Sequence, residues 1–253
     1  MLNVLITGAN GFFGKATIGR LKRENVNILT FTRKNNFQDL HDLVLRSDFI
    51  YHFAGEVRAG QSSIKYQRSN SELTQNLLDI LESNNKKTPI LFTSSIHSDK
   101  SVNSYGKTKK ESEKMIEKYA KKNSTKCYIY KLPHVFGEGC KPNYNSVITT
   151  WIYNSIKNFD IVIHDREIKM NYIYIQDIVD EFIALLTFTP DNLYLKPQLI
   201  YPTTLGDVLD YIEEFKVNIN NASYAIMGNE FKSKLYVTYQ SYFSDIKKWI
   251  HLA

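Results

Sequence analysis

A tyrosine and a lysine four residues apart, Tyr105 and Lys109, are the residues of this chain best suited to proton transfer. They stand in Tyr-Gly-Lys-Thr-Lys at the start of a predicted helix, where residues four apart share one face. A nearby ammonium favours the phenolate, so Lys109 is expected to lower the pKa of Tyr105 and make it a better proton donor to a forming alkoxide. Ser95, at the end of a predicted strand, can hydrogen-bond the same oxygen. Tyr-x-x-x-Lys is common by itself, so its position has to support this interpretation.

The N-terminal segment predicts a dinucleotide site that would position this chemistry. An apolar run at residues 4–6 leads into glycines 8, 11 and 14, spaced Gly-x-x-Gly-x-x-Gly, and a helix is predicted from residue 14. Such glycines let the backbone approach a pyrophosphate, and the helix that follows directs free amide groups at the phosphates. The alternative is a structural turn without a ligand. The predicted cofactor-binding residues of this turn are Thr7, Gly8, Asn10, Gly11, Phe12, Phe13 and Gly14.

The end of the second predicted strand favours NADP(H) over NAD. It reads Thr-Arg33-Lys34, and no carboxylate lies between Glu24 and Asp39 to hold the ribose 2′-hydroxyl of NAD. A guanidinium can bind the 2′-phosphate of NADP in a bidentate manner. Two solvated cations at a strand end are the alternative. The third strand ends in Phe53, Ala54 and Gly55, small enough at the last two positions to let the backbone pass beside the cofactor.

Composition excludes several other classes of protein. The 253 residues carry a net charge of +6, but lysines alternate with glutamates over residues 107–122, as on a solvated helix face. Nucleic-acid binding is therefore not expected, and mild basicity suits an anionic cofactor and substrate. Two cysteines without metal-ligand spacing predict neither a disulfide framework nor a metal site. Without a membrane-spanning run or a leader, the protein is expected to be cytoplasmic with no membrane partner.

Strands and helices are predicted to alternate through the first half of the chain. This alternation predicts an α/β fold, a Rossmann-type doubly wound parallel sheet with a small C-terminal substrate-binding lobe. The domains are predicted at 1–132, with a returning segment near 171–188, and at 133–253. The predicted strands are 4–6, 27–31, 49–53, 90–93, 127–130, 161–163 and 172–175. The predicted helices are 14–23, 39–45, 64–83, 105–122, 147–157 and 205–215.

Taken together, the motifs resemble the extended short-chain dehydrogenases/reductases that act on nucleotide sugars. The motifs in chain order are Thr7-Gly-x-x-Gly-x-x-Gly14, Ala54-Gly55, Ser94-Ser95, Tyr105-x-x-x-Lys109 and Pro133-His-Val-Phe-Gly137. The resemblance implies that Tyr105 is the general acid/base, that Lys109 binds the nicotinamide ribose and that Ser95 orients the carbonyl. It also places Pro133 near the nicotinamide and matches Asn70 to an asparagine usual in the family. A homodimer is implied by the resemblance alone.

A closer similarity lies in residues 140–148, Cys-Lys-Pro-Asn-Tyr-Asn-Ser-Val-Ile. This run resembles the reductase half of bifunctional capsular-polysaccharide enzymes that make UDP-2-acetamido-2,6-dideoxy-L-talose, in which a cupin domain epimerises C3. The expectation is therefore reduction of a UDP-linked 4-keto sugar, with any C3 epimerisation supplied by a separate protein. Ser95 is followed by Ile96 and His97, where nucleotide-sugar dehydratases carry Asp-Glu, so dehydration is disfavoured.

Substrate contacts are expected from the second half of the chain. His134, where relatives usually have asparagine, Lys141, Asn143, Asn145 and Arg166 are the candidates for the sugar, base or diphosphate, although His134 also fits a polar loop and Arg166 a surface ion pair. The rival functions are a dTDP- or UDP-4-keto-rhamnose type reductase, a C4 epimerase that retains NAD, and an NADP-binding sensor or scaffold without turnover. The Ser-Tyr-Lys set argues against the last of these.

Overall fold

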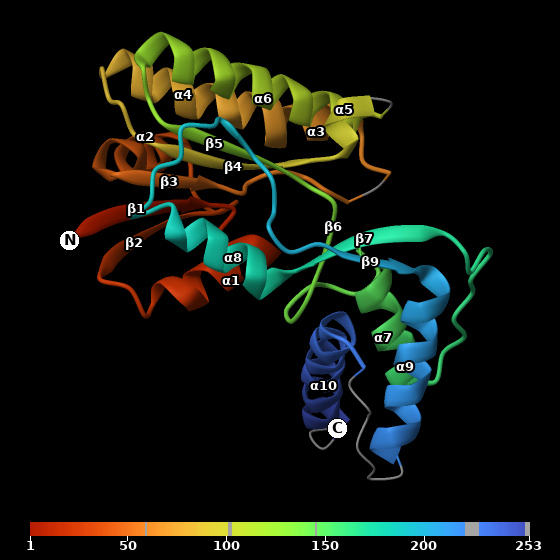
Figure 1. Cartoon of the computed structure of the whole chain (residues 1–253). Helices are drawn as coiled ribbons and strands as arrows, with labels where there is room; N and C mark the ends of the chain where they lie inside the picture. Colours follow the sequence, from red (N-terminus) through yellow and green to blue (C-terminus); the bar gives the residue numbers. More distant parts are fainter. Residues whose placement is uncertain (59, 101–102, 145, 221–227, 251–253) are drawn as a thin grey trace. The chain divides into compact units, whose positions relative to one another are not determined.

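The computed structural model describes the backbone of residues 1–58, 60–100, 103–144, 146–220 and 228–250 (Figure 1). The chain forms two compact units, residues 1–132 with 178–198, and residues 133–177 with 199–253. The first unit ends at Leu132, where the sequence places the domain limit. The returning segment is 178–198, whereas the sequence predicts 171–188, because the strand at 169–174 joins the sheet of the second unit.

A six-stranded parallel sheet forms the centre of the first unit, as the sequence predicts. The strand order is β2-β1-β3-β4-β5-β8, and every neighbouring pair is parallel. The order reverses between β1 and β3, so the switch point where α/β sheets bind ligands lies at their carboxyl ends. The strands are β1 (Leu2–Thr7), β2 (Val26–Phe31), β3 (Phe49–His52), β4 (Ile90–Ser95), β5 (Cys127–Leu132) and β8 (Tyr194–Leu195).

Helices cover both faces of this sheet. Figure 1 shows α4 and α6 over one face and α1 and α8 over the other. Buried aliphatic side chains of the strands and of α2, α4 and α6 form a continuous core on the first face, which fixes these helices on the sheet. The helices are α1 (Phe12–Leu21), α2 (Phe37–Arg46), α3 (Ser63–Tyr66), α4 (Leu73–Ser83), α5 (His97–Lys100), α6 (Ser104–Asn123) and α8 (Ile175–Ala184).

The helix predicted at 64–83 is interrupted by a wider turn. Between α3 and α4, the segment η1 (Gln67–Glu72) has π-helical hydrogen bonding, so the helical path is continuous from residue 63 to residue 83. Asn70 lies inside this turn and is buried. Single π-turns of this kind are frequent at functional sites because they redirect a side chain that a regular helix would place elsewhere.

The second unit contains helices and a three-stranded sheet, in the order β6-β7-β9. Its elements are β6 (His134–Phe136), α7 (Val147–Lys157), β7 (Lys169–Tyr174), β9 (Tyr201–Thr204), α9 (Leu205–Asn220) and α10 (Glu230–Ile250). The strand predicted at 161–163 is wrong. These residues form no strand, and Val162 is 70% exposed. The central strand β7 already pairs with β6 and β9 on its two edges, so this apolar run has no strand edge of β7 to join.

None of the helices in the described residues combines the length and the apolar character that crossing a bilayer requires. In the same residues, no group of three or more His, Cys, Asp or Glu side chains is arranged to hold a metal ion. Cys127 and Cys140 are both buried and unbridged.

Candidate active site

The glycine turn after β1 is packed so closely that no side chain fits at Gly8 or Gly14. Gly8 has a φ of +69°, and a Cβ there would lie 2.8 Å from the backbone nitrogen of Ala54. A Cβ at Gly14 would lie 2.4 Å from the carbonyl oxygen of Gly8. Gly11, the N-cap of α1, offers no side chain to the amide groups of the first helical turn. The turn therefore has the shape and the free donors that a pyrophosphate requires.

The aromatic residues of the turn pack into the unit. The ring of Phe13 lies 5.7 Å from that of Phe53 and 6.1 Å from that of Phe182, and Phe12 lies 5.8 Å from Phe13. Asn10 is exposed at the tip of the turn. Since the rings of Phe13 and Phe53 pack against each other, the backbones of these residues, and not their rings, are expected to face a cofactor.

A buried polar chain runs from the glycine turn to α4. The hydroxyl of Thr7 accepts a hydrogen bond from the backbone N–H of Ala54 at 3.1 Å and contacts Nδ1 of His52 at 2.8 Å. Nε2 of His52 contacts the hydroxyl of Thr74 at 2.9 Å. Burial, with the nearby charge of Lys109, lowers the pKa of His52 to about 3. A neutral histidine therefore links β1, β3 and α4 behind the switch point.

Asn70 joins the end of β3 to α6. Its Oδ1 accepts from the backbone N–H of Glu56 at 2.7 Å, and its Nδ2 donates to the hydroxyl of Thr108 at 3.0 Å. A Cβ at Gly55 would lie 2.8 Å from Oδ1 of Asn70 and 3.6 Å from Nζ of Lys109. The π-turn thus brings Asn70, Gly55 and Lys109 to one place.

Ser95 and Tyr105 also meet, from β4 and from the first turn of α6. The neighbouring Ser95 side chain lowers the pKa of Tyr105, against a larger effect of burial, which raises it to about 12. The Tyr105 ring lies 6.0 Å from that of Tyr66 and 6.4 Å from that of His97. The backbone N–H of His97 donates to Oγ of Ser95 at 3.2 Å. Near neutral pH the Tyr105 hydroxyl therefore keeps its proton.

The expected lowering of the Tyr105 pKa by Lys109 is not found in this structure. The Lys109 ammonium donates to the carbonyl oxygen of Thr93 at 2.9 Å and lies 4.5 Å from the centre of the Phe92 ring. Only 3% of Lys109 is exposed, and burial lowers its pKa to about 8. The sequence predicts that Tyr105 and Lys109 share a helix face, but the contacts with Thr93 and Phe92 on β4 decide where the Lys109 ammonium lies.

The predicted 2′-phosphate residues follow β2. The side chain of Arg33 is 79% exposed, and its Nη2 lies 3.3 Å from a carboxylate oxygen of the buried Glu56. Lys34 is exposed beside it. The turn that carries them is closed by Asn35, whose Oδ1 accepts from the backbone N–H of Thr32 at 2.8 Å. Two cations thus stand at the carboxyl end of β2, next to the switch point.

A family model described as the NAD dependent epimerase/dehydratase family matches residues 4–193, which include β1, the glycine turn, Ser95, Tyr105 and Lys109. The chain belongs to the NAD dependent epimerase/dehydratase family. The match spans nearly all of the first unit and part of the second.

Two relatives of this family member are similar over nearly its whole length. UDP-2-acetamido-2,6-beta-L-arabino-hexul-4-ose reductase of Pseudomonas aeruginosa is 32% identical over 248 residues, 96% of this chain and 66% of that protein. The crystal structure of the capsular polysaccharide assembling protein CapF from Staphylococcus aureus is 34% identical with a TM-score of 0.86, over 97% of this chain and 67% of that one. The chain thus spans about two thirds of the length of each.

The fold extends to more distant enzymes of nucleotide sugars. The UDP-glucose 4-epimerase of Thermus thermophilus in complex with NAD has a TM-score of 0.80 at 13% identity, over 95% of this chain and 99% of that one. At this identity the likeness concerns the fold alone.

The predicted substrate residues of this family member lie in its second unit. Pro133 begins that unit, and the exposed His134 on β6 has its ring 5.9 Å from that of Tyr172. Lys141 and Asn143 are exposed in the loop before α7, where the backbone N–H of Asn143 donates to the hydroxyl of Thr150 at 3.0 Å. Asn145 lies outside the described residues. Their contacts with a substrate stay predictions.

Arg166 has a partner that the sequence does not indicate. Its guanidinium pairs with Asp210 of α9 at 2.6 Å, and not with the neighbouring Asp165, and it also contacts the carbonyl oxygen of Gly206 at 3.4 Å. The surface ion pair that the sequence leaves open is therefore present, with a partner 44 residues away.

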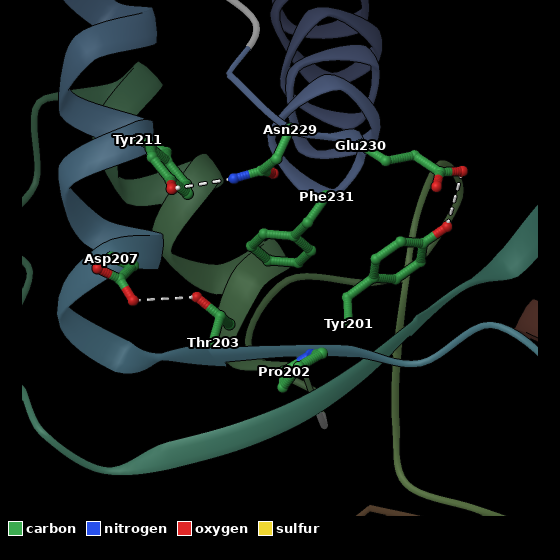
Figure 2. Close-up of a pocket in the computed structure, with 8 residues that line it drawn as sticks. All are labelled: Tyr201, Pro202, Thr203, Asp207, Tyr211, Asn229, Glu230 and Phe231. Carbon is green, nitrogen blue, oxygen red and sulfur yellow. Dashed lines mark hydrogen bonds between the residues drawn. The ribbon is translucent and has the colours of Figure 1, made fainter.

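A hollow of about 480 Å³ in the second unit contains none of the predicted site residues (Figure 2). Its carboxylates already have partners within the chain. Asp207 accepts from the backbone N–H of Thr204 at 3.1 Å, and Glu230 pairs at 3.0 Å with Lys234, which also binds Asp177 at 2.5 Å. The hollow is lined by Tyr201, Pro202, Thr203, Asp207, Tyr211, Asn229, Glu230 and Phe231.

Sequence reasoning missed His52 and the π-turn. His52 is a polar residue at the end of an apolar strand, two positions before Ala54. This position is the only feature of the sequence that could have indicated its role. The π-turn has no signal in residue types, because Gln67–Glu72 could equally form a regular helical turn.

Proposed function

We propose that this protein is an NADPH-dependent reductase of the C4 ketone of a UDP-4-keto-6-deoxy-2-acetamido-hexose. The observation that carries the proposal is that Ser95, at the carboxyl end of β4, and Tyr105, in the first turn of α6, come together beside His97, with Lys109 one helical turn further along α6. The name of the Pseudomonas relative, a 4-ulose reductase 32% identical over most of this chain, supports the choice of reaction and sugar.

The residues at the switch point fit a nicotinamide dinucleotide. The Gly8 and Gly14 backbones leave no room for a Cβ, which is the close approach that a pyrophosphate needs. Arg33 and Lys34 support NADP(H), since both are exposed and their charge complements a 2′-phosphate. When bound, the reduced nicotinamide supplies a hydride to the substrate carbon.

Tyr105 is assigned the proton that the reduction consumes. Because burial raises its pKa to about 12, the hydroxyl is protonated at neutral pH and can donate to the oxygen that becomes an alkoxide. Ser95 donates a hydrogen bond to the same oxygen and holds the carbonyl in place. Lys109, positively charged below its pKa of about 8, stabilises the negative charge that develops nearby.

The decisive experiment measures the loss of reduced-nicotinamide absorbance with NADPH and a panel of 4-keto-6-deoxy nucleotide sugars. Turnover is expected with UDP-2-acetamido-2,6-dideoxy-4-keto sugars. Faster turnover of a keto-rhamnose precursor, UDP- or dTDP-linked, would move the protein to the rhamnose type. Interconversion of C4 epimers without net oxidation of NADPH would indicate an epimerase. NADPH binding without turnover of any sugar would refute the reductase and favour the sensor or scaffold.

A tyrosine pair tests the assignment of the proton donor. Tyr105→Phe is expected to abolish turnover and to leave NADPH affinity nearly intact, because only the hydroxyl is lost. Tyr128→Phe is the matched control, since the buried hydroxyl of Tyr128 has no hydrogen-bond partner among the described residues. Retained activity in Tyr105→Phe would contradict its role. The cytoplasmic location, the homodimer and a separate C3 epimerase stay predictions.

A further inference from the structure

A carboxylate that the proposed reaction does not use is buried beside it. Glu113 stands on α6, eight residues after Tyr105 and four after Lys109, and it is 0% exposed. Its Oε1 accepts hydrogen bonds from the hydroxyls of Ser94 and Ser98, each at 2.5 Å. Burying a carboxylate costs free energy unless hydrogen bonds and opposite charges replace the lost water. The partners of Glu113 therefore indicate what it does in this position.

The other carboxylate oxygen of Glu113 binds two lysines. Oε2 lies 3.0 Å from Nζ of Lys110 and 3.6 Å from Nζ of Lys131, which stands on β5 directly opposite Ser94. One carboxylate therefore receives donors from β4, β5, α5 and α6.

These donors come from the elements that carry the catalytic residues. Ser94 directly precedes Ser95 at the end of β4, while Tyr105 and Lys109 belong to α6. The placement of Ser95 beside Tyr105 thus depends on how the end of β4 lies against α6. We propose that Glu113 is a positioning residue, which fixes the serine-bearing end of β4 against α6 and keeps a negative charge one turn from Lys109. The inference rests on the proposed function for its effect on turnover.

The charge of Glu113 also acts on Lys109. Burial lowers the pKa of Lys109 to about 8, and Glu113 opposes this by favouring the charged ammonium. The other groups that face the ammonium are the carbonyl oxygen of Thr93 on β4 and His52 on β3, which burial keeps neutral. With the carboxylate of Glu113 removed, no anion among these groups opposes the loss of charge on Lys109.

A glutamine pair on one helix tests this role without any substrate. Glu113→Gln keeps the size of the side chain and removes its charge, and Glu117→Gln makes the same change at an exposed position one turn later. In protein labelled with 13C at the lysine Cε, the Lys109 signal is assigned by its absence in Lys109→Arg. Its titration midpoint is expected to fall by about one pH unit in Glu113→Gln and to stay unchanged in Glu117→Gln.

Measurements of turnover in two variants separate the effect of Glu113 on the position of β4 from the effect of its charge on Lys109. In Glu113→Gln, kcat is expected to fall about 10- to 100-fold, with an alkaline limit that moves to lower pH. Ser94→Ala removes one hydrogen bond and keeps the carboxylate, so kcat should fall without a shift of the Lys109 midpoint. Normal kcat in a folded Ser94→Ala, or a Glu113→Gln that matches Glu117→Gln in both readouts, would overturn the proposal. If the wild type reduces no keto sugar, the proposed function fails while the lysine titration still decides whether Glu113 sets the charge of Lys109.

Discussion

Alanine at two glycines of the same helix should have opposite effects. Gly14 and Gly19 both lie on α1, but a Cβ at Gly14 would stand 2.4 Å from the carbonyl oxygen of Gly8 and 2.7 Å from Cα of Ala9, whereas at Gly19 it would meet nothing within 4 Å. Since the obstructing atoms at Gly14 are backbone, the turn itself has to move. Gly14→Ala is therefore expected to deform the turn, and Gly19→Ala is not.

The size of each effect follows from these contacts. Replacing a helical glycine by alanine stabilises by about 0.5–1 kcal/mol, and overpacking costs about 1–3 kcal/mol. Because the clash at Gly14 is with backbone atoms, its cost lies at the upper end, about 2–3 kcal/mol. Gly14→Ala should thus lose about 1–2.5 kcal/mol net, a fall in Tm of about 2–10 °C, while Gly19→Ala should gain about 1–4 °C. Displacement of the Gly8 carbonyl should also weaken NADPH binding about tenfold or more, which corresponds to about 1.4 kcal/mol.

The assay combines thermal unfolding without cofactor and titration of NADPH fluorescence for the wild type and both variants. The two variants are expected to move Tm in opposite directions, and only Gly14→Ala should lose cofactor affinity. If Gly14→Ala matches Gly19→Ala in both Tm and NADPH affinity, the turn is not a close-packed cradle and the argument from its glycines fails.

Three further predictions concern charge. Arg33→Ala should weaken NADPH about tenfold or more and NADH much less in binding titrations, because a charge-assisted phosphate contact is lost; equal losses would contradict a phosphate-reading role. Burial lowers the pKa of His52 to about 3, so the unfolded chain binds more protons than the folded chain between pH 3 and about 6.5. The free energy of unfolding therefore decreases as the pH is lowered through that window, by about 1.4 kcal/mol per pH unit. In urea unfolding against pH, His52→Asn should flatten this slope and His164→Asn, at an exposed histidine, should not. Lys234→Met should lower the free energy of unfolding in urea by about 3 kcal/mol, because it leaves the mostly buried carboxylate of Asp177 without its lysine. Lys126→Met, which breaks the exposed pair with Asp191, should lower it by less than about 1 kcal/mol.

Local pattern was enough for most elements of the first unit, although it missed β8, α5 and α8. The apolar runs predicted at 4–6, 27–31 and 90–93, and the helical stretches predicted between them, lie close to the observed strands and helices, because burial on a parallel sheet demands those patterns. The helix α7 has the predicted ends, 147 and 157. The strand at 161–163 failed because apolar residues become a strand only beside a partner with a free edge.

The features of the candidate site also fall into those that the sequence determines and those that depend on tertiary packing. The sequence by itself determined the glycine spacing, the positions of Ser95, Tyr105 and Lys109 at a strand end and on one helix face, and the absence of a carboxylate just after β2, since residue type and spacing settle these. Only the tertiary structure decided that burial raises the pKa of Tyr105, that Lys109 binds the Thr93 carbonyl and that Arg166 pairs across the unit. The physical reason is that solvation and ion pairing depend on which distant segments pack around a group, and that arrangement exists only in the folded chain.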